Sequence, residues 1–339
     1  MKHKFFKIYL PIISGVAITA TTFSILGALV FARYSRGIKV TDEDLQYIRN
    51  NNYVYDHVVI FGVDGAGGYF GEMDTPNFDR IFKTGSITYT GLAQYRTDSG
   101  QNWGSIIHGV RSCVHGINND VVSNQKYTSE DYPSFFKAYS TIHPDTYMVS
   151  DNDWTAINYG IIQDNIPGMN KIDASSRVTE DTSGLSWLES EKIIDRKVAD
   201  IAKEEILKNP SILFMHMDCV DAAGHSYGRG KPEYIDAMTY VDNLIGEIYD
   251  FSVAQGWENN TLYMCLSDHG HLKNGGHGCN AAPVRHVTLA VNGHKGNVIQ
   301  GECGYYVNQD AAAIVMYALG EKQPDDWEAT IPKNIFKGL

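Results

Sequence analysis

Six carboxylates and histidines that could bind metal ions stand just beyond apolar stretches of this sequence. Each alone is a weak indication, because an Asp after a strand is often a turn residue and a lone His is more often a hydrogen-bonded core or surface residue. Together they offer oxygen and nitrogen donors, a combination that suits zinc. They are too many for one tetrahedral ion and about right for two. The set is Asp64, Asp221, His225, Asp268, His269 and His277.

The segment 97–105 offers a nucleophile, Ser99. Two cations about 4 Å apart form a clamp for in-line displacement at phosphorus, one activating the attacking oxygen and the other steadying the leaving oxygen. A hydroxyl bound to a divalent cation loses its proton far more easily than a free one. A serine at the start of a helix also faces backbone N–H groups that can hold a phosphoryl oxygen, although a plain helix cap is the common alternative. Only the metal donors favour the nucleophile over the cap.

These side chains can meet only if the elements before them end at one edge of a sheet. Four nearly continuous apolar runs are typical of strands buried on both faces in a parallel sheet. In such sheets ligands bind beyond the carboxyl ends of the strands. Asp64 follows the first run, Asp221 the second and Asp268 the third. The runs are 58–63, 212–217, 261–266 and 287–291.

Segments with helical periodicity accompany these strands, at 186–208, 233–251 and 310–319. The alternation predicts an α/β fold, with a doubly wound, mostly parallel sheet sandwiched by helices. Residues 125–185 are the least regular stretch. We expect them to form either a cap or substrate-facing insertion, or a long surface excursion.

The N-terminal residues 8–32 contain no charged side chain, and that length spans a hydrocarbon core of about 30 Å. We expect an uncleaved transmembrane anchor rather than a signal peptide, whose apolar region is shorter; secretion after cleavage is the alternative. Lys2, Lys4 and Lys7 favour a cytoplasmic N-terminus and an extracytoplasmic body at the cell membrane. The expected organisation is an anchor at 1–36, a linker at 37–54, a catalytic domain at 55–325 and a tail at 326–339.

The distribution of charge along the sequence argues against nucleic acid as a partner. The net charge is -12, but the first 36 residues hold five of the 28 basic residues and no acid, which leaves 23 basic against 40 acidic residues in the remainder. A body with such an excess of acid would repel nucleic acid. Most of the acid would serve solubility, and some of it could hold cations. An odd count of five cysteines cannot pair fully within one chain, and no disulfide is predicted.

The ordered motifs over about residues 55–325 resemble the alkaline phosphatase superfamily, and in particular its type I phosphodiesterase/nucleotide pyrophosphatase branch. The turn at 63–67 resembles the first metal-binding turn, and Asp268-His269-Gly270 resembles the Ser-Asp-His-Gly metal pair. The matching segments are Val63-Asp64-Gly65, Ser99-Gly100-Gln101-Asn102, His115-Gly116-Ile117, Asp221-Ala222-Ala223-Gly224-His225, Val241-Asp242, Ser267-Asp268-His269-Gly270 and Gln309-Asp310.

The resemblance implies a role for each matching residue. Ser99 would be the nucleophile, forming a covalent phospho-seryl intermediate that water releases, and Asn102 would donate a hydrogen bond to a phosphoryl oxygen. The implied ligands of the first zinc are Asp64, Ser99, Asp268 and His269, and those of the second are Asp221, His225 and His277.

The chain departs from that branch at several points. Ser99 stands where the branch usually has Thr, and Gly100-Gln101 replaces Phe-Pro, so the aromatic residue that would stack on a nucleotide base is missing. The spacing of His277 is more like that of the glycolipid ethanolamine-phosphate transferases. His271 and His286 could be residues that support the ligands or plain surface residues.

The expected function is therefore a membrane-anchored, extracytoplasmic phosphoesterase, similar to phosphodiesterases, that uses two divalent cations, with zinc as the expected metal. Its substrate would be a phosphate ester in a small molecule, a lipid headgroup or a glycan. One alternative is a transferase that moves a phospho-alcohol headgroup between lipids or glycans. Another is a binding ectodomain that kept the fold without activity.

Overall fold

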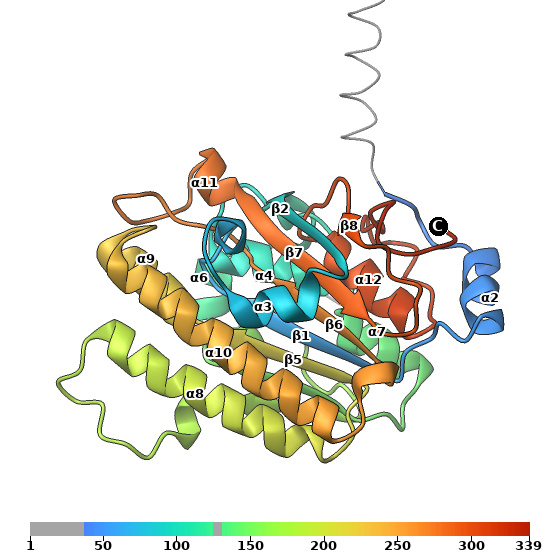
Figure 1. The fold of residues 1–339 in the computed structure, drawn as a ribbon, viewed down its shortest axis with the longest axis horizontal. Coiled ribbons are helices and arrows are strands. Elements are labelled where there is room, and N and C mark those ends of the chain that lie inside the picture. Colours follow the sequence, from blue (N-terminus) through green and yellow to red (C-terminus); the bar gives the residue numbers. More distant parts are fainter. Residues whose placement is uncertain (1–36, 125–130) are drawn as a thin grey trace, which may run out of the picture. The chain divides into compact units, whose positions relative to one another are not determined.

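Eight strands in the described part of the chain form one sheet, in the order β4-β3-β5-β1-β6-β7-β2-β8 (Figure 1). The strands from β4 to β6 run parallel, whereas β7 runs antiparallel to both of its neighbours. The predicted α/β sheet is confirmed, but it is mixed, because the run at 287–291 lies in the reversed strand. The strands are β1 His57–Val63, β2 Ser86–Leu92, β3 Met148–Asn152, β4 Met169–Asp173, β5 Ile212–Met217, β6 Thr261–Leu266, β7 His286–Gly293 and β8 Gly301–Glu302.

This computed structural model describes residues 37–124 and 131–339. The stretch at 8–32 that we expect to be an anchor lies outside these residues. Within the described ranges, no helix has both the length and the apolar character needed to cross a membrane. The helices are α2 Asp42–Asn50, α3 Pro76–Phe82, α4 Ser99–His108, α5 Ser112–His115, α6 Asn119–Ser123, α7 Phe135–Ile142, α8 Trp187–Ile206, α9 Cys219–Tyr227, α10 Pro232–Ala254, α11 Ala282–Arg285 and α12 Asp310–Ala318.

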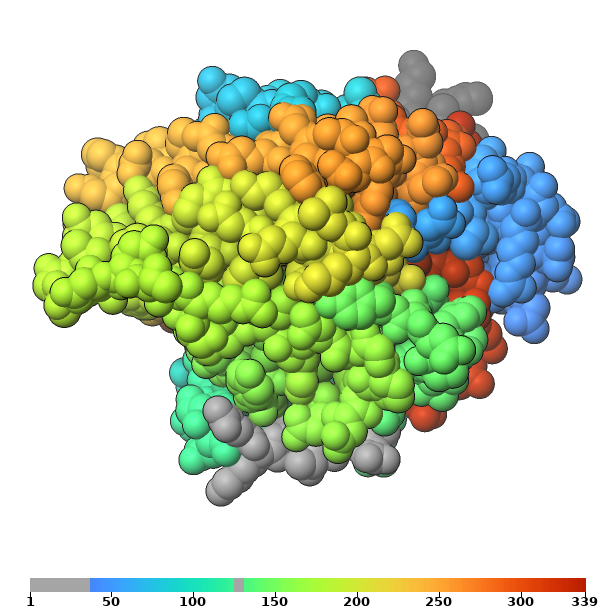
Figure 2. Space-filling model, turned by 90° about the horizontal axis from the view of Figure 1, so that it is seen from below, coloured from blue at the N-terminus to red at the C-terminus, as the bar shows by residue number. Residues whose placement is uncertain are grey.

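Helices cover both faces of the sheet, and the alternation of side chains along β1 explains why. Val58 and Ile60 point into a core shared with α2, α4, α7 and α12, whereas Val59 and Phe61 point into a core shared with α3, α8, α9 and α10. Figure 2 shows α8 and α10 side by side over the second face. A strand buried on both faces must be apolar throughout, which is the pattern that the sequence shows at β1, β5 and β6.

The register of the three central strands brings their carboxyl ends level. Val63 at the end of β1 pairs with Met217 at the end of β5, and Gly62 pairs with Leu266 at the end of β6. Because parallel strands deliver their following residues to the same edge, the loops after all three meet there. Strand β7 is reversed, so its first residue, His286, also lies at this edge.

The observed architecture differs from the expected organisation in three places. Residues 148–173 are not a cap, because they supply β3 and β4 of the sheet itself. The expected linker at 37–54 contains α2, which begins with a capping box between Thr41 and Asp44. The expected tail is part of the core: Trp327, Ile331 and Phe336 are fully buried. Residues 37–339 thus form one unit. The five cysteines, all in the described ranges, are unpaired.

Candidate metal and nucleophile site

The turn after β1 places Asp64 against the helix that follows β5. The Asp64 N–H donates to the Met217 carbonyl over 3.0 Å, which continues the pairing of the two strands. Gly65 then adopts a φ of +68°, and a Cβ there would come within 2.8 Å of the Cα of Asp221. Only glycine allows both this left-handed backbone and this close approach. Helix α9 carries Asp221 and His225 one turn apart, so both side chains lie on the same face.

A first cluster forms around Asp64. His269 Nε2 lies 3.4 Å from Asp64 Oδ1 and 3.3 Å from Asp268 Oδ2. Ser99, the first residue of α4, places its Oγ 3.1 Å from His269 Nε2 and 3.5 Å from Asp64 Oδ1. The structure therefore brings together the four residues that we expect to hold one ion, although their role as ligands stays a prediction.

Buried hydrogen bonds fix the carboxylates of this first cluster. Asp64 Oδ2 accepts the indole N–H of Trp103 over 2.8 Å and lies 3.0 Å from His216 Nε2. Asp268 Oδ1 accepts the Gly65 N–H over 3.1 Å. One oxygen of each carboxylate is thus committed to the fold. The other oxygens, Asp64 Oδ1 and Asp268 Oδ2, face His269.

Burial and nearby charges shift the pKa values of three groups in the first cluster. Burial by itself would raise the pKa of Asp64, yet the His216 hydrogen bond and the charge of His269 hold it below the ordinary value. Burial and the negative charges of Asp64 and Asp221 raise the pKa of Asp268 well above its usual range. Burial, reinforced by His277, lowers the pKa of His269 well below its usual value. In the metal-free protein these neighbours therefore disfavour a second negative charge at Asp268 beside that of Asp64.

A second cluster surrounds Asp221. His225 Nε2 lies 3.3 Å from Asp221 Oδ2 and 3.0 Å from His277 Nε2, and His277 Nε2 lies 3.9 Å from Asp221 Oδ1. The three predicted ligands of the second ion are thus also brought together. Burial and the nearby charge of Asp64 raise the pKa of Asp221 to about 7, although His225 acts against the shift.

A third imidazole, His271, joins the second cluster. His271 is fully buried, and its Nε2 lies 2.7 Å from Asp221 Oδ1. Burial lowers the pKa of His271 to about 4, so its ring is neutral near pH 7. Gly224 makes room for this ring, because a Cβ at that position would lie 2.3 Å from His271 Cδ2. We interpret His271 as a residue that orients the Asp221 carboxylate.

The donors fit a pair of divalent cations. Asp268 Oδ2 and the Nδ1 atoms of His269 and His271 are buried without a hydrogen-bond partner. Buried polar atoms are normally paired, so an unpaired carboxylate oxygen among further carboxylates fits a cation. The groups whose donor atoms lie within 4.8 Å of one another include Asp64, Asp268 and His269, and Asp221, His225 and His271. Mixed oxygen and nitrogen donors suit zinc.

Asn102 is also buried, and its side chain is engaged by the chain itself. Its Nδ2 donates to the carbonyls of Arg96 and Asp98, and its Oδ1 accepts the Gln94 N–H over 2.6 Å. These bonds hold the segment that leads to Ser99. The predicted donation from Asn102 to a phosphoryl oxygen is not tested by these contacts. An exposed amide, that of Asn119, lies beside Ser99 instead, since its Oδ1 accepts the Gly100 N–H over 2.8 Å.

A family model of the type I phosphodiesterases and nucleotide pyrophosphatases matches residues 58–279, from β1 through the glycine-rich loop that carries His277. This is more than half of the chain. The chain belongs to this family. The predicted resemblance to the alkaline phosphatase superfamily and to this branch is confirmed.

Curated relatives match over a shorter segment. GPI ethanolamine phosphate transferase 1 of Saccharomyces cerevisiae is 32% identical over 74 residues, which is 22% of this chain and 8% of the transferase. The transferase of the same name from Yarrowia lipolytica is 28% identical over 90 residues, 26% of this chain and 10% of that protein. The chain thus spans only a small part of the length of these relatives.

Solved structures share the fold at low identity. Murine ectonucleotide pyrophosphatase/phosphodiesterase 5 gives a TM-score of 0.60 at 14% identity, covering 81% of this chain and 97% of that chain. Lipoteichoic acid synthase LtaP from Listeria monocytogenes gives a TM-score of 0.60 at 14% identity, covering 88% of this chain and 82% of that chain. A 2-O GAG sulfatase, BT1596, gives a TM-score of 0.63 at 11% identity, covering 82% of this chain and 73% of that chain. At these identities the likeness shows the fold alone.

Two supporting residues of this phosphodiesterase family member were not predicted from its sequence, since Trp103 and His216 both contact Asp64. His271, whose role was left open, contacts Asp221. His216 offered a signal, because it is the one polar residue in the apolar strand β5. Trp103 offered none, because an indole in a helix is most often core packing. His286, left open at first, lies at the start of β7 and lines a separate cavity with Tyr89 and Arg229.

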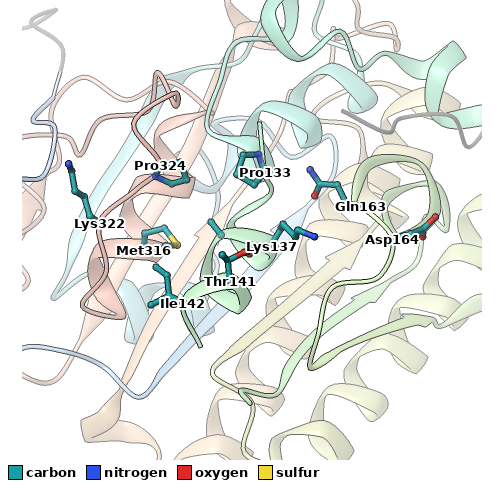
Figure 3. A pocket seen from close by; sticks show the side chains of 10 residues that line it. Pro133, Lys137, Thr141, Ile142, Gln163, Asp164, Met316, Lys322 and Pro324 are labelled. Carbon is teal, nitrogen blue, oxygen red and sulfur yellow. The ribbon is translucent and has the colours of Figure 1, made fainter. Parts of the chain in front are cut away.

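A larger cavity lies away from this chemistry, between α7 and α12 (Figure 3). Its volume is about 400 Å³, and it shares no residue with either cluster. Half of its lining residues are apolar, and Lys137 and Lys322 also line it. The lining residues are Pro133, Lys137, Ala138, Thr141, Ile142, Gln163, Asp164, Met316, Lys322 and Pro324.

Proposed function

We propose that the protein is a metal-dependent phosphoesterase that cleaves phosphodiesters through Ser99. The observation that supports this most strongly is the position of Ser99 Oγ, 3.1 Å from His269 Nε2 and 3.5 Å from Asp64 Oδ1 at the N-terminus of α4. A serine that merely capped the helix would have no reason to lie among buried carboxylates and imidazoles. The family of the chain supports the same chemistry.

The proposed reaction has two displacements at phosphorus. Two divalent cations, with zinc the best fit, would neutralise the phosphoryl oxygens and favour loss of the Ser99 proton. Asp64, Ser99, Asp268 and His269 would hold one cation, and Asp221, His225 and His277 the other. Ser99 Oγ forms a bond to phosphorus as the bond to the leaving alcohol breaks. Water then attacks phosphorus, breaks the bond to Ser99 Oγ and restores the hydroxyl.

The chain itself prepares the nucleophile for this reaction. The N-terminus of α4 carries partial positive charge that favours the phosphoryl group next to Ser99. The position of α4 is fixed because Asn102 binds the preceding segment. His277 is fixed to the same segment, since its Nδ1 lies 2.8 Å from the Thr97 carbonyl oxygen. Both clusters are therefore held in register with Ser99.

Transfer of a phospho-alcohol group is the second candidate. The GPI ethanolamine phosphate transferases of two yeasts match a short segment of this chain. A transferase would share the covalent step and discharge the group to a sugar hydroxyl instead of to water. The predicted anchor at 8–32 suits either function, and we propose a single-pass cell-membrane protein with an extracytoplasmic body. A binding ectodomain without activity is less well supported, because the seven candidate ligands are present and meet.

One experiment separates these functions. The full-length protein, purified in detergent and supplied with zinc, is incubated with bis-p-nitrophenyl phosphate. Steady release of p-nitrophenol is expected for a hydrolase, whereas a burst equal to the enzyme concentration would favour a transferase. Elemental analysis of the same sample should give two metal ions per chain. Folded protein with no bound metal and no release would instead favour the binding ectodomain and contradict the proposal.

A further inference from the structure

A cavity with a basic lining is formed in part by the loops that also carry residues of the second cluster. Its volume is about 430 Å³, within the range of small-molecule sites. Three of its residues are basic and one is acidic, whereas residues 37–339 as a whole carry a large excess of acid. We call this cavity the basic pocket. Its lining is Tyr69, Glu72, Arg229, Gly230, Lys231, Lys273 and Asn274.

The walls of the basic pocket continue the loops that carry the candidate metal ligands. Lys273 lies between His271 and His277, and four residues of chain bring its Cα within about 14 Å of that of His277 at most. Arg229 is separated from His225 by the same number of residues. The two loops are joined directly, because the Arg229 N–H donates to the Leu272 carbonyl over 3.0 Å.

Arg229 is fixed in the wall of the basic pocket. Its guanidinium pairs with Glu72 and lies over the Tyr69 ring, 4.7 Å from the ring centroid. The side chain is only 15% exposed. A fixed, planar guanidinium loses little freedom when it binds an anion, and its fork of N–H groups matches phosphate oxygens. The single acid, Glu72, is already used by this pair.

Lys231 and Lys273 add positive charge to the lining of the basic pocket. Both are exposed, and neither ammonium group makes a hydrogen bond or ion pair with residues 37–124 or 131–339. Unpaired lysines are common on surfaces, but these two line one cavity with a fixed arginine. Since the rest of the body repels anions, a local positive lining is where an anionic group would be held.

We propose that the basic pocket binds a second phosphate group of the substrate, on the alcohol side of the phosphodiester that Ser99 attacks. This inference rests on the proposed function and narrows it to phosphodiesters that carry a further phosphate. A phosphate is the anion that best uses a fixed guanidinium together with two mobile ammonium groups. The reaction itself is unchanged, because the pocket only holds the distal group.

The test compares two p-nitrophenyl phosphodiesters that differ in the distal alcohol, which is 1,3-propanediol or its 3-phosphate. With the full-length, zinc-supplied protein we expect a kcat/KM about tenfold higher for the phosphorylated substrate, mainly through a lower KM. The advantage should shrink as salt rises from 0.05 to 0.5 M, because exposed charges are screened. In the Lys231→Ala/Lys273→Ala variant the ratio should fall to within about twofold of one.

The matched control removes two lysines at the opposite edge of the sheet. Lys295 follows β7, which ends at that edge, and Lys337 donates to the carbonyl of Gly296 beside it. The Lys295→Ala/Lys337→Ala variant should keep the wild-type preference. All variants should turn over the unphosphorylated diester at the wild-type rate, which also reports that they are folded.

Equal kcat/KM for the two diesters in the wild-type protein would overturn the inference while leaving the proposed function intact. No turnover of either diester would instead remove the proposed function. A phosphate in the basic pocket could also belong to a lipid, so a second arm measures turnover of the unphosphorylated diester in detergent micelles with and without 20% phosphatidylglycerol. If phosphatidylglycerol inhibits the wild type but not the Lys231→Ala/Lys273→Ala variant, and the soluble pair shows no preference, the pocket serves a lipid headgroup and the inference about the substrate is wrong.

Discussion

The two clusters at the carboxyl edge of the sheet are built differently. The carboxylates of the first, Asp64 and Asp268, are fully buried and fixed by groups from a strand, a helix and the backbone. In the second cluster, His225 has a side chain that is 36% exposed, and His277 lies on a glycine-rich loop. The first cluster is therefore preorganised by the core, whereas the second depends on loops that can adjust.

Because of this difference, we expect the two clusters to differ in cation affinity and in access to water. Preorganised donors bind a cation without the cost of ordering side chains, so we expect the tighter ion beside Ser99. The more exposed cluster is open to water and substrate, as the second displacement requires.

Ser99→Ala should lower kcat for bis-p-nitrophenyl phosphate by at least about a thousandfold, because no other hydroxyl lies in the first cluster. Two metal ions per chain should remain, since one hydroxyl is only one of the predicted ligands. Turnover and elemental analysis are measured on the same sample. Near-normal turnover by this variant would show that Ser99 is not the nucleophile. Ser123→Ala, at an exposed position on α6, is the control.

Asp268→Asn should weaken the tighter ion by more than about a hundredfold, because it removes charge from a fully buried donor set. His225→Gln should weaken the other ion less, by about tenfold, because water can replace a half-exposed imidazole. Zinc titration monitored by calorimetry measures both affinities. The comparison between the clusters would be wrong if the two substitutions had equal effects.

His271→Ala should lower the affinity of the second ion by about tenfold without changing that of the first, because the Asp221 carboxylate loses the partner at its Oδ1. His271→Gln should recover part of the loss, since an amide N–H can donate to the same oxygen. Competition with a zinc chelator measures the affinity without using activity. An equal loss in both variants would mean that His271 is itself a ligand.

The smallest effect concerns pH. The folded pKa of Asp221 is raised from 3.8 to about 7, so the metal-free folded protein binds more protons than the unfolded chain between these values. Stability from this group is therefore present below about pH 4 and is lost as pH rises toward 7. As pH rises from about 4 to 7, the Tm of the metal-free wild type should fall by roughly a few degrees more than that of Asp221→Asn. With zinc bound, the difference should vanish or reverse.

The central half of the fold could be predicted from the sequence. Strands β5 and β6 have the predicted bounds, and β1 and β7 differ by one or two residues at their ends, because strands buried on both faces require nearly unbroken apolar runs. The rest of the sheet gives no such run. Strand β3 contains Ser150, Asp151 and Asn152, all buried, which a reading of hydrophobicity cannot distinguish from a loop.

The candidate ligands could be predicted for the same reason, since each follows a recognisable strand. Their supporting residues could not. His216 and Trp103 contact Asp64 from 152 and 39 residues away, and only the packed structure brings such distant positions together. The direction of β7 could not be predicted either, because an apolar run indicates burial and gives no direction.

The reversal of β7 has a consequence for how this site can diversify. The connection that leaves β6 with Asp268 returns to β7 at the same edge, so both of its ends are anchored beside the candidate metal site. Residues can be inserted or exchanged within this connection without shifting any strand. A single stretch of chain could thus be remodelled while the scaffold that positions Asp64 and Ser99 stays constant.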